Sequence, residues 1–241
     1  MKHGQSQSRW ACGPGEILRH GLSLLENDSD INRRLAMISI DNSVELMIQT
    51  YLGLPKRITG LSVTRKEYQG IAESFPALLD GLETYAPEKL DGIDLGTIEW
   101  YHRLRNELYH QGNGLTVERD KVEVYAELAN LLFRNLFGDE LVPHIDPETA
   151  LLGEVIGSWA TLEVKLRDMA SNIAGDDPAP AGLIGTLQLL RDANGLNVDN
   201  LRELDNLRRL RNEVVHGQTN HRKLLTRQII ERVEVFIKLF M

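Results

Sequence analysis

Apolar residues recur every three or four positions along most of the chain, which is the pattern of amphipathic α-helices. Alternating runs of β-branched residues, which would indicate strands, are nearly missing. The pattern therefore predicts an all-α fold. In the first half, the expected helices span residues 14–26, 30–52, 94–110 and 117–137, with a further helical segment between Thr64 and Pro87 that is broken near Pro76.

Residues that begin and end helices support these bounds. Asp30 is a candidate N-cap of the helix over residues 30–52, and Gly53 follows the end of that helix. Thr64 and Glu67 have the spacing of a capping box, which predicts that a new helix begins after Thr64.

The same order of elements begins again in the second half. Asp146 is the predicted cap and Pro147 the predicted first residue of a helix that reaches about Asn172. Further helices are expected over residues 183–192, 198–216 and 220–240. Because each half has a long helix, a connector and two more helices, we predict two tandem helical domains, residues 1–141 and 142–241.

One polar octamer occurs in both halves, at the end of the corresponding helix. Residues 103–110 read RLRNELYH and residues 209–216 read RLRNEVVH, so six of the eight positions are identical. At about 100° per residue, the first arginine, the asparagine and the glutamate flank the histidine on one helix face. These residues are Arg103, Asn106 and Glu107 around His110, and Arg209, Asn212 and Glu213 around His216.

The second arginine of each octamer, Arg105 or Arg211, falls on the apolar stripe of its helix. A guanidinium in that position needs a carboxylate or another anion as its partner. Glu45 lies on the apolar line of the preceding long helix, and Glu163 has the same place in the second half. We therefore predict that Glu45 pairs with Arg105 and that Glu163 pairs with Arg211. A purely structural ion pair is an equally open interpretation of each.

His110 and His216 end their helices, because a glycine follows each of them within two residues. A helix C-terminus favours the protonated imidazolium, which suits a group that gives or takes a proton near neutral pH. Capping of the helix end is the simpler interpretation of a single histidine in this position. That interpretation explains less well why two copies carry arginine five residues earlier and asparagine four residues earlier.

This arrangement resembles the motif of the HEPN superfamily, in which arginine and a polar residue, often asparagine, precede a histidine at the end of a bundle helix. Arg105-Asn106 with His110 fits the motif, and the second octamer fits it in the same way. The resemblance covers roughly residues 14–140 and 146–241. It implies two HEPN-like helical bundles that form one cleft as an intrachain pseudo-dimer.

The resemblance further implies a metal-independent endoribonuclease. One histidine, His110 or His216, would remove the proton of the RNA 2′-OH, and the other would protonate the leaving 5′-oxygen. The products would end in 2′,3′-cyclic phosphate and 5′-OH. Arg105 and Arg211 would stabilise the charge on the phosphate, and the other polar octamer residues would orient the imidazoles or bind phosphate. No cofactor and no metal are expected.

Composition and charge limit these expectations. The chain is 42% hydrophobic and 26% charged, with no long apolar run and no secretory signal, so we expect a cytoplasmic protein without membrane contact. Its only cysteine, Cys12, excludes an internal disulfide and a cysteine-rich metal site. The net charge of −8 disfavours broad nucleic-acid binding, although residues 202–232 hold eight basic and four acidic residues, a net +4.

RNA, most simply single-stranded, is the expected partner. The family resemblance adds an antitoxin or activator protein, a second copy of the chain, and a toxin or antiviral defence setting. The first alternative is a noncatalytic HEPN-like module that binds RNA, a nucleotide or a protein, which the acidic net charge favours. The second alternative is a structural helical bundle. Five large side chains are expected in the core: Trp10, Trp100, Trp159, Met37 and Met47.

Overall fold

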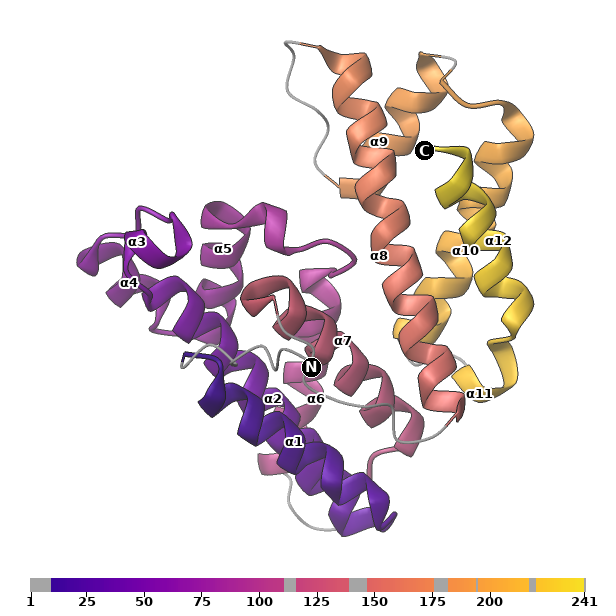
Figure 1. The fold of residues 1–241 in the computed structure, drawn as a ribbon. Coiled ribbons are helices and arrows are strands. Elements are labelled where there is room, and N and C mark those ends of the chain that lie inside the picture. The colour runs from indigo at the N-terminus through magenta and orange to yellow at the C-terminus, as the bar shows by residue number, and fades with distance from the viewer. Residues whose placement is uncertain are drawn as a thin grey trace, which may run out of the picture. The chain divides into compact units, whose positions relative to one another are not determined.

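The computed structural model describes residues 10–110, 116–138, 147–175, 182–193, 195–216 and 220–240. These residues form helices and connecting turns with no strand among them, which confirms the all-α class. None of the helices so described is both long and apolar enough to cross a membrane. The chain divides into two compact units, Met1–Ile145 and Asp146–Met241 (Figure 1). The boundary predicted between residues 141 and 142 lies outside the described residues.

The first unit is built around its second helix. Its elements are α1 (Cys12–Glu26), α2 (Asp30–Gly53), α3 (Lys56–Thr59), α4 (Arg65–Ile71), α5 (Phe75–Tyr85), the short 3-10 helix η1 (Pro87–Lys89), α6 (Leu95–His110) and α7 (Arg119–Phe137). Helix α2 packs against α1, α5, α6 and α7 (Figure 1). Met37, Ile40, Met47 and Ile48 of α2 are fully buried. The octamer helix α6 is therefore positioned against a helix that contributes many residues to the core of the unit.

Side-chain caps determine where several of these helices begin. Ser29, rather than the predicted Asp30, caps α2, because the Ser29 hydroxyl accepts a hydrogen bond from the Asn32 N–H. Asp30 is instead the first helical residue, where a negative charge favours the helix N-terminus. The predicted capping box of Thr64 and Glu67 is confirmed, with both of its reciprocal hydrogen bonds present.

The connector between α2 and α6 contains a close contact between α4 and α5. The break predicted near Pro76 lies just before it, at residues 72–74, because Pro76 occupies the first turn of α5. A Cβ atom at Gly81 of α5 would lie 2.7 Å from Cγ2 of Ile71 in α4. The two helices can approach this closely only because residue 81 has no side chain.

The second unit has five helices among its described residues: α8 (Pro147–Ala174), α9 (Gly182–Asp192), α10 (Val198–Val215), α11 (His221–Leu224) and α12 (Arg227–Leu239). Helix α8 packs against α9 and α12, and α9 also contacts α10. The prediction of one helix over residues 220–240 is wrong. Leu225 and Thr226 are extended, and they separate α11 from α12.

Four of the five large side chains expected in the core are at least partly buried. Met37, Met47 and Trp159 are buried, and Trp100 is half-buried. The prediction for Trp10 is wrong, since its side chain is 49% exposed. Trp10 precedes α1 and so does not lie on the buried face of that helix.

Candidate functional site

Both octamers end their helices, as predicted. Residues 103–110 are the last eight residues of α6. His216 is the C-cap of α10, and its backbone N–H donates to the carbonyl of Asn212 at 2.9 Å. The side chain of His110 lies outside the described residues.

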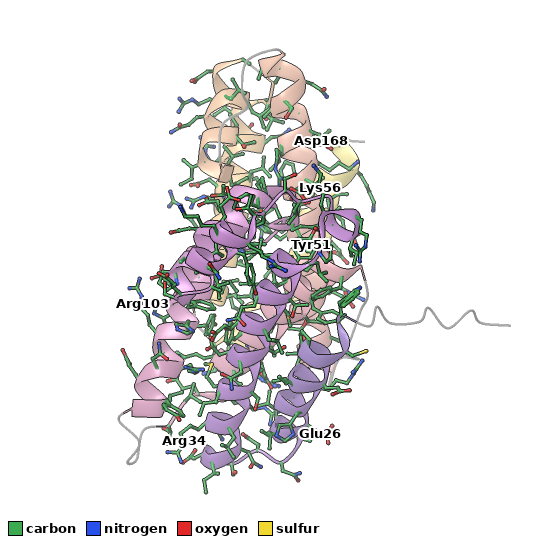
Figure 2. All side chains as sticks on the ribbon, turned by 90° about the vertical axis from the view of Figure 1, so that its left-hand side faces the viewer. Glu26, Arg34, Tyr51, Lys56, Arg103 and Asp168 are labelled. Atoms are coloured by element: carbon green, nitrogen blue, oxygen red, sulfur yellow. The ribbon has the colours of Figure 1, made fainter. Side chains whose placement is uncertain are left out.

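The first arginine of each octamer lies on the solvent-exposed face of its helix. Arg103 pairs with Glu99, and Arg209 pairs with Asp205, in each case one turn earlier on the same helix. Figure 2 shows Arg103 at the outer edge of α6. The octamer glutamates are also exposed: Glu107 and Glu213. Exposed pairs of this kind contribute little to stability, so these residues are available to a partner.

The second arginine of the first octamer, Arg105, reaches from α6 to α2. Its Nε lies 3.1 Å from Oδ2 of Asp41, a carboxylate with an exposed fraction of 0%. This contact is an ion pair, because the Nε–H does not point at the oxygen closely enough for a hydrogen bond. Nη2 donates to Oδ1 of Asn42 at 2.5 Å, and Nη1 donates to Oδ1 of Asn106 at 2.8 Å.

The predicted pair between Glu45 and Arg105 is therefore wrong. Glu45 instead accepts a hydrogen bond from Gln49 at 3.1 Å. Lys89, just before α6, lies over the ring of Tyr51 near the end of α2, so the two helices run in opposite directions. Glu45, one turn further along α2 than Asp41, consequently lies too near the start of α6. The apolar line correctly indicated which face of α2 meets α6, but it could not indicate which residue along that face lies opposite Arg105.

Asp41 is shared by three side chains from two neighbouring helices. Its Oδ1 accepts from the hydroxyl of Tyr125 at 2.7 Å, and its Oδ2 contacts both Arg105 and Nδ1 of His102, the latter at 3.0 Å. Burial, reinforced by the charge of Asp41, raises the pKa of Tyr125 well above its ordinary value, so the phenol stays a donor. A buried carboxylate needs such partners.

Sequence reasoning missed Asp41, His102 and Tyr125 as members of the site. A signal for Asp41 exists, because it lies on the line of Met37, Val44 and Ile48, which are all buried. A single acidic residue on such a line needs a buried cationic or hydrogen-bonding partner.

The second octamer repeats part of this geometry. Arg211 is buried, with an exposed fraction of 7%, and its Nη1 donates to Oδ1 of Asn212 at 3.2 Å. That contact corresponds to the one between Arg105 and Asn106. Glu163 accepts a hydrogen bond from Nε1 of Trp159, and its pairing with Arg211 stays a prediction.

Carboxylates accompany most of the arginines in the net-positive segment over residues 202–232. The described ion pairs are Arg202–Asp199, Arg208–Asp205, Arg209–Asp205, Arg227–Glu154 and Arg232–Glu203. Two of these carboxylates, Asp199 and Glu154, lie outside the segment whose charge was counted. The segment is therefore less basic than its own sequence suggests.

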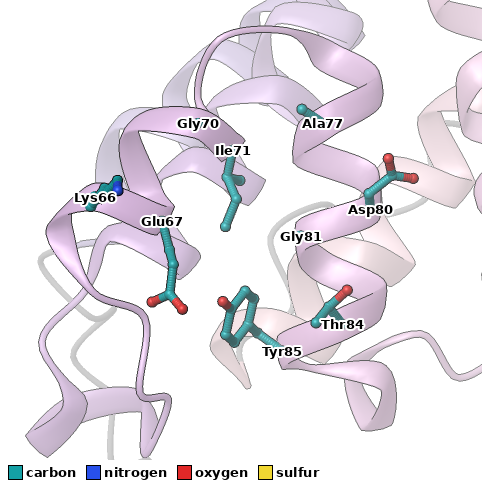
Figure 3. Close-up of a pocket in the computed structure, with 9 residues that line it drawn as sticks. All are labelled: Lys66, Glu67, Gly70, Ile71, Ala77, Asp80, Gly81, Thr84 and Tyr85. Carbon is teal, nitrogen blue, oxygen red and sulfur yellow. The ribbon is translucent and has the colours of Figure 1, made fainter.

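A groove of about 620 Å³ lies between α4 and α5. It is lined by Lys66, Glu67, Gly70, Ile71, Ala77, Asp80, Gly81, Thr84 and Tyr85. Figure 3 shows the side chains of Glu67 and Tyr85 facing each other across it. Hydrogen bonds with Thr64, and to a smaller extent with Tyr85, lower the pKa of the Glu67 carboxyl. No octamer residue lines this groove.

Comparison with models of protein families, with curated proteins and with solved structures found no match to this chain. The resemblance to HEPN proteins therefore rests on the repeated octamer and on its position at helix ends. What the structure adds is the contact set around Arg105: a buried carboxylate, an imidazole and two amide side chains.

Proposed function

We propose that this protein is a metal-independent endoribonuclease of the HEPN type. It cleaves RNA by attack of the 2′-OH, which leaves 2′,3′-cyclic phosphate and 5′-OH ends. The observation that carries the proposal is common to both octamers. In each, the second arginine turns toward the packed side of its helix and donates to the next asparagine, and the histidine ends the helix.

The contacts of Arg105 suit a phosphate-binding group. A guanidinium has five N–H donors. Asn42 and Asn106 each accept from one N–H of an Nη atom, and Nε lies in ion-pair contact with Asp41, which leaves a second N–H on each Nη atom. Two such donors match two oxygens of a phosphate, and the ion pair with the Asp41 carboxylate holds the guanidinium in position.

The proposed reaction needs two proton transfers. One of His110 and His216 takes the proton of the 2′-OH, and the other gives a proton to the 5′-oxygen. Arg105 and Arg211 stabilise the negative charge that develops on the phosphate. We further propose that the two octamers serve one cleft of an intrachain pseudo-dimer, and that an antitoxin or activator protein, or a second copy of the chain, controls it in a toxin or defence system in the cytoplasm.

A second candidate function is a noncatalytic module that binds RNA, a nucleotide or a protein. The ion pairs that engage arginines of the segment over residues 202–232 favour this candidate. The net charge of −8 favours it as well, because it opposes broad binding to a polyanion.

Cleavage of end-labelled single-stranded RNA in EDTA tests the proposal. We expect the wild type to produce ends with 2′,3′-cyclic phosphate, and the double variant His110→Ala/His216→Ala to be slower by about 100-fold or more. His20→Ala is the matched control, because His20 is exposed on α1 and belongs to neither octamer. Folded wild type that cleaves no RNA would contradict the proposal. RNA binding that the double variant loses would then favour the binding module.

A further inference from the structure

Asp41 and His102 form a dyad of the kind that orients a histidine for proton transfer. Nδ1 of His102 lies 3.0 Å from Oδ2 of Asp41. An ionised carboxylate only accepts hydrogen bonds, so Nδ1 is the donor in this contact, and in the neutral imidazole Nε2 then carries the lone pair. Nε2 has no hydrogen-bond partner among the described residues, and it is not one of the buried atoms without a partner, so it reaches solvent.

The neighbouring helices hold this imidazole firmly. Its ring stacks on that of Phe75 in α5, with centroids 3.9 Å apart and an interplanar angle of 8°. The side chain keeps an exposed fraction of 14%. Tyr125 of α7 fixes the other oxygen of Asp41. General acid–base catalysis needs a proton-transfer group that a neighbouring group orients. Here the imidazole of His102 is the first, the carboxylate of Asp41 is the second, and stacking on Phe75 holds the ring.

The dyad lies beside the proposed phosphate-binding group, because Arg105 and His102 contact the same oxygen of Asp41. Along α6, Arg105 lies about 4.5 Å of helix rise beyond His102.

We propose that His102 is a proton-transfer residue beside Arg105, and that it serves as the base in place of one of the two octamer histidines. This inference rests on the proposed ribonuclease function. Nε2 of His102 takes the proton of the 2′-OH, the 2′-oxygen forms a bond to phosphorus, and the bond from phosphorus to the 5′-oxygen breaks. The 5′-oxygen takes a proton from the imidazolium of an octamer histidine, His110 or His216. Exchange of protons with water then restores both histidines.

The second unit has other residues at the corresponding sequence positions. Arg208 stands where the first octamer helix has His102, and it pairs with Asp205. Trp159 lies four residues before Glu163, as Asp41 lies four residues before Glu45. The dyad is consequently a property of the first copy, and the proposal assigns the proton abstraction to that copy.

The test uses the full chain and end-labelled single-stranded RNA in EDTA. We expect His102→Ala to slow cleavage by about 100-fold or more. The same substitution at the exposed His20 is the matched control, and it leaves the rate unchanged. His102→Gln is the second variant, because its amide can still donate to Asp41 but cannot take a proton.

Rescue by free imidazole separates catalysis from structure. His102→Ala removes a ring from between Phe75 and Asp41, which leaves a space of the right shape for imidazole. Added imidazole is expected to restore part of the cleavage by His102→Ala and to leave His20→Ala unaffected. A slow His102→Ala variant that imidazole does not rescue would mean a structural role, and it would overturn the inference.

The outcomes separate this inference from the function on which it rests. Cleavage by wild type and by folded His102→Gln at the same rate overturns the role of His102 and leaves the ribonuclease proposal standing. Wild type that cleaves no RNA overturns both. Cleavage by wild type, with a loss in both His102 variants and rescue of His102→Ala, supports both.

Discussion

A single carboxylate on α2 makes side-chain contacts with two other helices of the first unit. The carboxylate of Asp41 contacts His102 and Arg105 of α6 and Tyr125 of α7, and none of its surface is exposed. Removal of one member from a buried charged cluster is costly, because the groups that remain have lost their partner. Asp41 therefore determines how the octamer helix lies against the core.

The substitution Asp41→Asn tests this role. We expect it to lower the free energy of unfolding by about 2 to 3 kcal/mol, because a neutral amide leaves Arg105 without its buried counterion. Glu45→Gln on the same helix is the matched control and should change the free energy by less than about 0.5 kcal/mol. Urea denaturation followed by circular dichroism measures both. Equal losses in the two variants would contradict the assignment of Asp41 as the partner of Arg105.

The sequence predicted one part of this cluster and missed another. The position of Arg105 on the apolar stripe correctly indicated that it needs a partner from the neighbouring long helix. The identity of that partner depends on how far α6 is shifted along α2, and helical periodicity contains no information about that shift. His102 was missed for the same reason, since its polar contact among the described residues is with a residue 61 positions earlier.

At the scale of elements, the contact between α4 and α5 depends on a missing side chain. Ile71 of α4 occupies the space where residue 81 of α5 would place a Cβ. The branched carbons of isoleucine are held near its backbone and cannot easily move aside. Gly81 is therefore fixed by packing, although glycine is otherwise unfavourable inside a helix.

A pair of glycine substitutions tests this packing. Gly81→Ala is expected to lower the free energy of unfolding by about 1 to 3 kcal/mol through overpacking against Ile71. Gly70→Ala in α4 meets nothing within 4 Å, so it should stabilise the helix by about 0.5 to 1 kcal/mol. Thermal unfolding of the two variants measures the difference. A Gly81→Ala variant as stable as Gly70→Ala would show that the two helices can separate at no cost.

Helix ends were predictable where the chain carries cap residues, glycine or proline. The capping box at Thr64 and the end of α7 at Gly138, where φ is 78°, are examples. The separation of α11 from α12 had neither a glycine nor a proline to indicate it. Leu225 and Thr226 are extended there, although the spacing of apolar residues through this stretch predicts one continuous helix.

At the scale of the whole molecule, the two units differ in their aromatic residues. All six tyrosines lie in the first unit, and residues 146–241 contain none. Tyr101 and Tyr125 stack in its core, with ring centroids 4.5 Å apart. Burial raises the pKa of both phenols above the ordinary value of 10.0. The second unit has a single tryptophan, Trp159.

These differences predict that alkaline pH destabilises the first unit selectively. Because the folded pKa values of Tyr101 and Tyr125 are raised, the neutral phenols stabilise the fold fully below pH 10.0, the ordinary pKa, and this contribution is lost as the pH rises beyond it. Urea unfolding measured below and above pH 10.0 should show a lower free energy of unfolding at the higher pH for the first unit. The second unit should show no such decrease.

Fluorescence can follow the units one at a time. The variant Trp10→Phe/Trp100→Phe keeps Trp159 as the reporter of the second unit, and Trp159→Phe keeps the reporters of the first. Tyr125→Phe, which cannot ionise, should reduce the alkaline loss in the first unit. An equal alkaline loss in both units would refute the role of the buried phenols.

The repeated octamer also has a genetic consequence. In a homodimer, one codon specifies both copies of a site, so every mutation is doubled. Here two codons specify the corresponding residues, and the residues differ: the helix with the first octamer has His102 and Tyr109 where the second has Arg208 and Val215. Each copy can therefore be mutated while the other stays wild type. The effect of a substitution such as Arg208→His therefore reports on one octamer helix alone.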